Sequence, residues 1–179
     1  MSLHEIGINA RKWFTYSRVE IHDIRQVILD AIDPDTEIKI GTDAQRSGTA
    51  HNFVTVLILY KPGKGGRVLY SKDRVTRKLT LWDKLSTETW KSLEVAMMVE
   101  EIIGNRNCIS VHVDATDDPQ FKSSDYVKQL CGMVVGSGFK SVIKPDAAAS
   151  SHAADAIVKN KHIPNVKERF PKRKSRRQK

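Results

Sequence analysis

The spacing of apolar residues changes from strand-like to helical near residue 79, and this change constrains the fold more than any other feature. Before it, apolar residues alternate with polar ones or run together, as is typical of strands. These strand-like segments cover residues 37–43, 53–60 and 68–70, with polar or glycine-rich turns between them. After it, helical spacing persists as far as Gly104. The pattern therefore predicts an antiparallel meander of three strands followed by a long helix.

Helices and strands alternate in the rest of the chain. We expect a strand at 109–114, a helix from Ser123 or Ser124 to about Val135, a strand at 139–144 and an alanine-rich helix at 147–159. The resulting order βββαβαβα predicts an α/β fold with a mixed five-stranded sheet flanked by helices. This order is the one found in the ribonuclease H-like fold.

The two ends of the 179-residue chain differ from this core. The segment Ser17-Arg18-Val19-Glu20 is a capping-box pattern and predicts a helix that stops at Asp33-Pro34. We therefore divide the chain into an N-terminal helical extension (1–34), a ribonuclease H-like domain (35–160) and a basic tail (161–179). The tail holds nine Lys or Arg residues and one acid, within a net charge of +9. We expect it to be disordered, because it has few apolar side chains to bury.

Composition excludes several classes of protein. No apolar run approaches the roughly 18 residues of a membrane helix, and the first ten residues lack a signal-peptide pattern. Cys108 and Cys131 have no CxxC spacing, so neither a disulfide framework nor a zinc site is expected. We expect a cytoplasmic protein without membrane contacts.

Two of the predicted strands end in an aspartate. Asp43 follows Ile40-Gly41-Thr42, and Asp114 follows Val111-His112-Val113. An aspartate that closes an apolar strand is unfavourable unless it is solvated, paired or bound to a cation. A single such residue is commonly a turn former. Two of them, on strands that are neighbours in this topology, indicate a functional site.

The long helix offers two candidates for a third acidic ligand, Glu88 and Glu94. At about 100° per residue from Leu85, Glu88 falls at about 300°, within the apolar face, and Glu94 falls at about 180°, toward solvent. We favour Glu88, because a glutamate on a buried face requires a reason and an exposed one does not.

The last predicted helix supplies a fourth acid. Asp155 lies among small alanines that allow close approach to the sheet, whereas its rival Asp146 is better suited to cap the helix. We favour Asp155 over Asp146. His152 lies one turn before Asp155 and can face the same cleft, which makes it a candidate catalytic residue.

Four converging carboxylates repel one another unless cations lie between them. Oxygen ligands without a Cys or His cluster favour Mg²⁺ or Mn²⁺ over Zn²⁺. Two such ions about 4 Å apart can activate a water molecule and stabilise the leaving oxygen in phosphodiester cleavage. The proposed metal ligands are Asp43, Glu88, Asp114 and Asp155.

Several segments together resemble the YkuK-like family of bacterial ribonuclease H-like proteins. They are Gly41-Thr42-Asp43-Ala44-Gln45, Lys84-Leu85-Ser86-Thr87-Glu88, Val113-Asp114, Lys144-Pro145-Asp146 and the stretch 149–155. The likeness covers roughly residues 35 to 160. It implies the ribonuclease H fold and a two-metal nuclease site, with Asp43 as the central ligand, Glu88 and Asp114 completing the site, and Asp155 or Asp146 as the helix aspartate.

These residues lead to two hypotheses of function. The first is a Mg²⁺- or Mn²⁺-dependent nuclease acting on RNA, DNA or a hybrid, with a basic tail that attracts phosphates. The alternative is a non-catalytic nucleic-acid-binding module on the same fold. Phosphoryl transfer on a nucleotide is disfavoured because the chain has no GxxxxGK[ST] loop. A basic and aromatic surface suited to nucleic acid is predicted from Lys72, Arg74, Arg77, Lys78 and Trp82.

Overall fold

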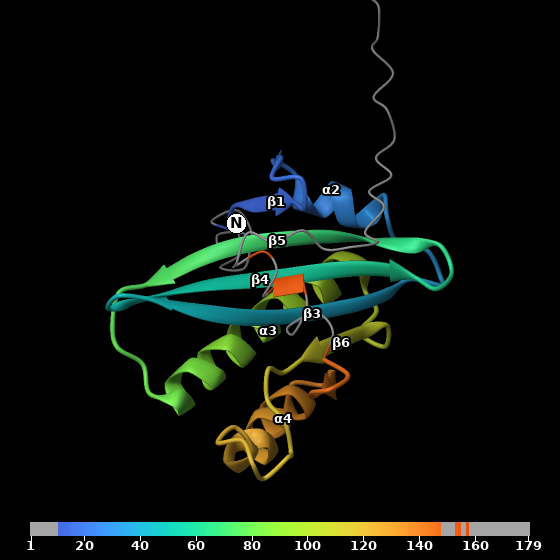
Figure 1. Cartoon of the computed structure of the whole chain (residues 1–179). Coiled ribbons are helices and arrows are strands. Elements are labelled where there is room, and N and C mark those ends of the chain that lie inside the picture. The colour runs from blue at the N-terminus through green and yellow to red at the C-terminus, as the bar shows by residue number, and fades with distance from the viewer. Residues whose placement is uncertain (1–10, 148–152, 155–156, 158–179) are drawn as a thin grey trace, which may run out of the picture.

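The computed structural model describes residues 11–147, 153–154 and 157. The strands are β1 (Trp13–Thr15), β2 (Glu20–Ile21), β3 (Glu37–Ser47), β4 (Ala50–Lys61), β5 (Gly65–Val75), β6 (Ile109–His112) and β7 (Lys140–Val142). The helices are α2 (Ile24–Leu29), α3 (Leu81–Ile103) and α4 (Val127–Gly136), with a 3₁₀ turn η1 (Ser124–Tyr126) before α4. In Figure 1 the long strands β3, β4 and β5 run side by side, with α3 behind them and α4 beside β6.

The sheet has the order β2-β1-β5-β4-β3-β6-β7. The strands β3, β4 and β5 form the predicted antiparallel meander. The strand β6 then pairs with β3 in parallel, and β7 pairs with β6 in parallel. The mixed sheet and the α/β class are therefore confirmed. The sheet contains two strands more than the predicted five, β1 and β2, which extend it beyond β5.

Apolar side chains cover both faces of the sheet, which explains the continuous apolar run in β4. Leu57 and Leu59 point into the larger core with residues of α3 and α4. Val54 and Val56 point to the opposite face, where they pack with Val68 and Tyr70 and with the buried helical residues Ala153, Ala154 and Ile157. A strand that is buried on both faces loses the polar–apolar alternation of a half-exposed strand.

The first hairpin is longer than predicted. β3 does not end at Asp43 but continues to Ser47, through the pairs Gln45–Asn52, Arg46–His51 and Ser47–Ala50. Gly48 has a φ of +62° and forms part of the tight turn. The residues at this end of the hairpin are mostly polar and exposed. Backbone pairing therefore extends both strands here, although no alternation of polar and apolar residues in the sequence predicts it.

The prediction of a helix from Ser17 is wrong. The chain before and after Ser17 forms β1 and β2, and the helix α2 begins only at Ile24, with Asp23 as its N-cap. Trp13 on β1 is almost fully buried in the main core. Pairing of β1 with β5 and burial of this indole outweigh a local capping pattern. The three-part division of the chain stays a prediction, and the tail lies outside the described residues.

The long helix α3 agrees with its prediction at both ends. Thr80 and Asp83 form a capping box at its start, and Gly104, with a φ of +67°, ends it. Of the last predicted helix, the described residues Ala153, Ala154 and Ile157 are helical. Within the described part of the chain, no helix combines the length and the apolar character needed to cross a membrane.

The close approach of β4 and β5 yields a prediction about stability. A Cβ on Gly66 would lie 2.9 Å from the carbonyl oxygen of Leu59 and 3.2 Å from Cα of Tyr60. We expect Gly66→Ala to lower the free energy of unfolding in urea by about 1–3 kcal/mol, because this backbone has to shift. As a control, Gly132→Ala on the exposed side of α4 meets nothing within 4 Å and should add up to about 1 kcal/mol. Equal effects of the two substitutions would contradict this packing.

Candidate functional site

Asp43 and Asp114 lie at the same level of two adjacent parallel strands. β3 and β6 are paired as far as Gly41 and His112, so each aspartate comes two residues after this last pair. β6 ends there, whereas β3 continues. Both side chains are only partly exposed, at 16% and 14%. The parallel pairing therefore places these two predicted site residues at one position along the sheet.

The helix α3 brings Glu88 to the same place. Glu88 is 2% exposed, whereas the Glu94 side chain is 46% exposed and pairs with Arg11. The predicted burial of Glu88 and exposure of Glu94 are therefore both confirmed. Their difference follows from their positions on α3, since only Glu88 shares the face that packs on the sheet.

A buried chain of hydroxyl groups connects α3 to the sheet beside the acidic residues. The Thr42 hydroxyl lies 2.8 Å from Ser92 Oγ and 3.0 Å from Thr55 Oγ1. Ser92 in turn donates a hydrogen bond of 3.0 Å to the backbone carbonyl of Glu88. These contacts hold one turn of α3 against β3 next to Asp43, and they satisfy polar groups that the core would otherwise leave unpaired.

A lysine lies among the carboxylates. Lys84 is one helical turn before Glu88, and its Nζ is 2.9 Å from Glu88 Oε1 and 3.8 Å from Asp43 Oδ1. Asp114 has its own lysine, because Lys144 Nζ lies 2.7 Å from Asp114 Oδ1. The site therefore consists of three carboxylates and two ammonium groups. These five residues come from β3, α3 and the segment around β6 and β7.

The charges and the burial of this cluster shift its pKa values. Burial raises the pKa of Glu88 to about 8; the Lys84 ammonium opposes this shift, and the charges of Asp43 and Asp114 add to it. Burial alone would lower the pKa of Lys84, but Glu88, Asp43 and Asp114 together raise it above its ordinary value. The Lys84 side chain therefore stays positively charged at neutral pH. The Glu88 side chain, by contrast, keeps its proton up to a pH of about 8.

His112, at the last β3–β6 pair, is buried and neutral at physiological pH. Burial lowers its pKa to about 4, and the positive charges of Lys39 and Lys140 also lower it. Its Nε2 lies 3.2 Å from Ser110 Oγ. His112 therefore adds no positive charge beside the carboxylates.

Glu88 provides the observation that tests whether a metal ion fits here. Its Oε1 lies 2.9 Å from Lys84 Nζ, whereas its buried Oε2 has no hydrogen-bond partner among the described residues. A buried carboxylate of this kind is costly unless a cation binds it. Oxygen donors from Asp43, Glu88 and Asp114 suit Mg²⁺ or Mn²⁺. In the described ranges, however, the three are not already spaced as a set of metal ligands.

The remaining predicted site residues have different outcomes. Asp155 and His152 lie outside the described residues. Asp146 is exposed in the turn after Lys144. The sequence reasoning missed Lys84 and Lys144. Lys84 carried a signal, because a lysine four residues before a buried glutamate shares its side of the helix, whereas Lys144 meets Asp114 only through the fold.

The comparisons with known proteins agree with this architecture. The family model described as Ribonuclease H-like matches residues 20–159. The chain therefore belongs to the ribonuclease H-like family, as its sequence motifs predicted. Among curated proteins it is similar to the uncharacterized protein YkuK of Bacillus subtilis, with 27% identity in an alignment of 137 residues that covers 68% of this chain and 78% of YkuK.

Two solved structures are also similar to this chain. The RNase H1 of the archaeon Halobacterium salinarum is 17% identical, with a TM-score of 0.37 over 69% of this chain and 98% of that one. The N-terminal RNase H domain of a Mycobacterium tuberculosis protein, solved as a fusion with maltose-binding protein, is 14% identical. Its TM-score is also 0.37, over 70% of this chain and 98% of that one.

The raised pKa of Glu88 predicts how stability depends on pH in metal-free buffer. The folded protein keeps the Glu88 proton up to a pH of about 8, whereas the unfolded chain releases it near the ordinary value of 4.5. The Glu88 contribution to the free energy of unfolding therefore falls as pH rises between these values and is constant above them. Glu88→Gln cannot ionise, so it should gain stability relative to wild type from pH 5 to pH 8.

The measurement is urea unfolding in EDTA at pH 5, 6.5 and 8. Glu94→Gln, a change of the same kind at an exposed position of α3, should follow the wild-type profile. Apart from the substituted glutamate, each variant has the same titrating groups as wild type, so these cancel in the comparison. Parallel profiles of wild type and Glu88→Gln would show that Glu88 has no raised pKa in the folded protein.

Proposed function

We propose that this protein is a divalent-metal-dependent nuclease that hydrolyses phosphodiester bonds in nucleic acid, and that it acts in the cytoplasm. The observation that carries the proposal is Glu88, a buried acid whose Oε2 has no hydrogen-bond partner among the described residues, next to Asp43 and Asp114. Membership of the ribonuclease H-like family supports a nuclease-type function on nucleic acid.

Asp43, Glu88 and Asp114 would hold Mg²⁺ or Mn²⁺, with Asp155 as a fourth ligand and His152 as a further catalytic residue. The chemistry that such a cation would supply is activation of water for attack on phosphorus and stabilisation of the leaving oxygen. The chain itself supplies rigidity, since Asp43 lies within a paired strand and Glu88 lies on a helix that is hydrogen-bonded to that strand through Ser92. Burial of Glu88 keeps bulk water away from one side of the site.

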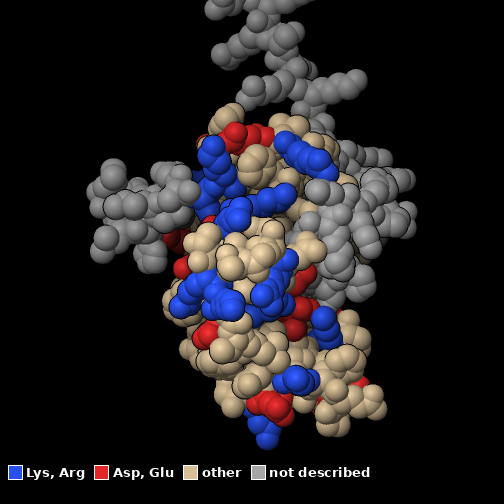
Figure 2. Space-filling view, turned by 60° about the vertical axis from the view of Figure 1, so that its left-hand side comes forward, with Lys and Arg blue, Asp and Glu red and all other residues tan. Residues whose placement is uncertain are grey.

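A basic surface lies at the same end of the sheet and supports nucleic acid as the substrate. Arg46 precedes the β3–β4 turn, and Arg74 is paired with Asn52 on the other side of this hairpin. Arg77 and Lys78 follow in the exposed connection to α3. Figure 2 shows Lys and Arg side chains gathered across this end, with Asp and Glu side chains next to them. Such a basic surface attracts the phosphate groups of nucleic acid toward the acidic site.

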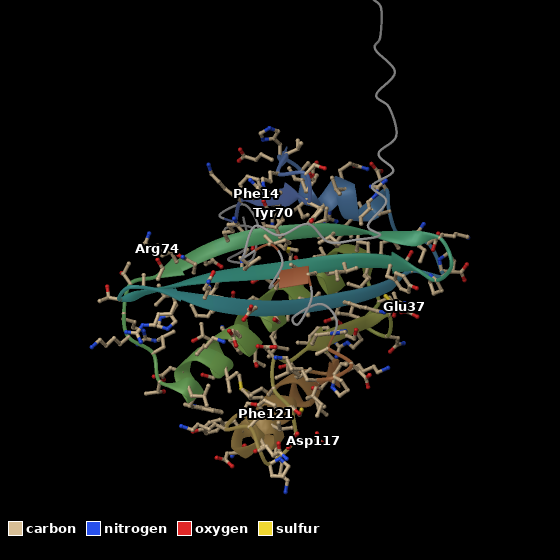
Figure 3. The ribbon with its side chains drawn as sticks, in the orientation of Figure 1. Phe14, Glu37, Tyr70, Arg74, Asp117 and Phe121 are labelled. Atoms are coloured by element: carbon tan, nitrogen blue, oxygen red, sulfur yellow. The ribbon has the colours of Figure 1, made fainter. Side chains whose placement is uncertain are left out.

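Aromatic side chains continue this surface. Trp82, in the first turn of α3, is 37% exposed, and its ring centroid lies 5.4 Å from that of Tyr126. Phe121, which lies beside α4 in Figure 3, is also largely exposed. Exposed rings next to basic side chains are suited to stacking with unpaired bases. We therefore infer that a single strand crosses Trp82 on its way to Glu88, which is less than two helical turns away.

The alternative function is a nucleic-acid-binding module without turnover. Two observations favour it: Lys84 already pairs with Asp43 and Glu88, and the described part of the chain holds no ready-made set of three metal ligands. In that case the lysine stabilises the acids as a structural cluster. The basic surface would then account for the whole activity.

Metal binding and cleavage distinguish these two functions. We expect Mg²⁺ or Mn²⁺ to raise the melting temperature of the wild type, since the ions bind only the folded site, and to support cleavage of RNA, DNA or hybrid oligonucleotides. Asp43→Asn should lose both effects while keeping the fold. The control is Asp117→Asn, an exposed aspartate in the loop after β6 (Figure 3), which should retain both. Binding of oligonucleotides without a metal effect or cleavage would establish the alternative.

The stacking surface predicts a difference between two tryptophans of α3. Trp82→Ala should weaken binding of a single-stranded oligonucleotide about tenfold, a loss of roughly 1–3 kcal/mol per stacked base. Trp90→Ala removes an indole that is 50% exposed eight residues further along the helix, and it should leave binding unchanged. Fluorescence anisotropy in EDTA measures both without cleavage. Equal losses in the two variants would place the strand elsewhere.

A further inference from the structure

The cluster at the site holds more acid than base, and one of its cations is enclosed. Lys84 contacts carboxylates from two elements, Glu88 on its own helix and Asp43 on β3. The charge of Asp114 also acts on it. Its side chain is 26% exposed, so most of it is held within the fold. Lys144 differs, because its side chain is 40% exposed and can withdraw from Asp114 into solvent.

A second cluster further along α3 shows what a balanced arrangement looks like. There, Arg11 pairs with Asp73 and Glu94, and Lys91 lies 3.0 Å from Asp73. Two bases meet two acids, so no charge is left over. At the candidate site, by contrast, the enclosed Lys84 ammonium group contacts two carboxylates and is also affected by the charge of a third, Asp114.

The charge count limits how many ions the site can take. Metal ligands bind in their ionised form, so Asp43, Glu88 and Asp114 supply three negative charges when loaded. Lys84 cancels one of them and leaves two, provided that the more exposed Lys144 gives up its contact with Asp114 to the metal ion. One divalent cation neutralises that remainder, whereas a second would leave two positive charges in a poorly solvated pocket, where repulsion is strong.

We propose that the Lys84 ammonium takes the place of a second metal ion, so that the site binds a single divalent cation. This inference rests on the proposed nuclease function, and it concerns how the site is charged. An ammonium group has three donors and a compact positive charge. Next to one cation it can bind a phosphate oxygen and balance negative charge that develops during cleavage. Lys84 is then a substrate-contacting and charge-balancing residue of the site.

The test is a Mn²⁺ titration of the full chain, with free Mn²⁺ counted by electron paramagnetic resonance and binding followed by calorimetry. We expect one ion per chain in wild type, and one in Lys84→Arg, which keeps the charge. Lys84→Met removes the charge and should bind two ions. Lys91→Met removes a lysine of the same helix from the balanced cluster, so it should still bind one. Asp43→Asn should lose the site.

Two results would overturn the inference: two ions in wild type, or a single ion in folded Lys84→Met. Circular dichroism checks folding, and Lys84→Gln, which is also neutral but more polar, replaces the methionine variant if that one fails to fold. A different result is expected if the proposed nuclease function itself is wrong: wild type would then bind no Mn²⁺ and would cleave no nucleic acid. Two ions together with cleavage would leave the nuclease intact and remove only the role of Lys84.

Discussion

The parallel pairing of β3 with β6 is the constraint on which the site depends. It joins a strand of the meander to a strand that follows the long helix, and it sets the register at Gly41 and His112. Asp43 and Asp114 reach one level of the sheet only through that register. A shift of one residue would turn one of the two side chains to the other face. The chain between these strands must form α3, which lays Glu88 against the same position.

The polar groups beside this pairing limit the positions that α3 can take along the sheet. Thr42 and Ser92 bind one another in the core, and an apolar contact there would leave the helix free to slide. A buried ion pair such as that of Glu88 and Lys84 often contributes no more to stability than an apolar pair of the same volume. Their presence in the core, next to two further acids, is easier to understand as a requirement of function than of folding. A stable fold is maintained by the apolar packing of both sheet faces.

The fold was largely predictable because its longest elements have strong local signals. The three strands of the meander and α3 follow from apolar spacing, capping residues and glycine. Predictions failed where a local sequence pattern competed with pairing or packing between segments far apart in the chain. Ser17 and Glu20 form a capping pattern, yet the surrounding chain pairs with β5, which lies about fifty residues away. The hairpin beyond Asp43 was missed because exposed polar strands carry little pattern.

The sequence by itself determined where the three candidate acids stand: two aspartates that follow apolar strands, and Glu88 on the apolar side of a helix. These signals are local, because the direction of a side chain follows from the period of its own element. Only the tertiary structure decided that Lys84 lies between Glu88 and Asp43, and that Lys144 reaches Asp114. Such distances depend on strand register and on helix packing across the sheet. The charge balance of the site is therefore a property of the folded chain.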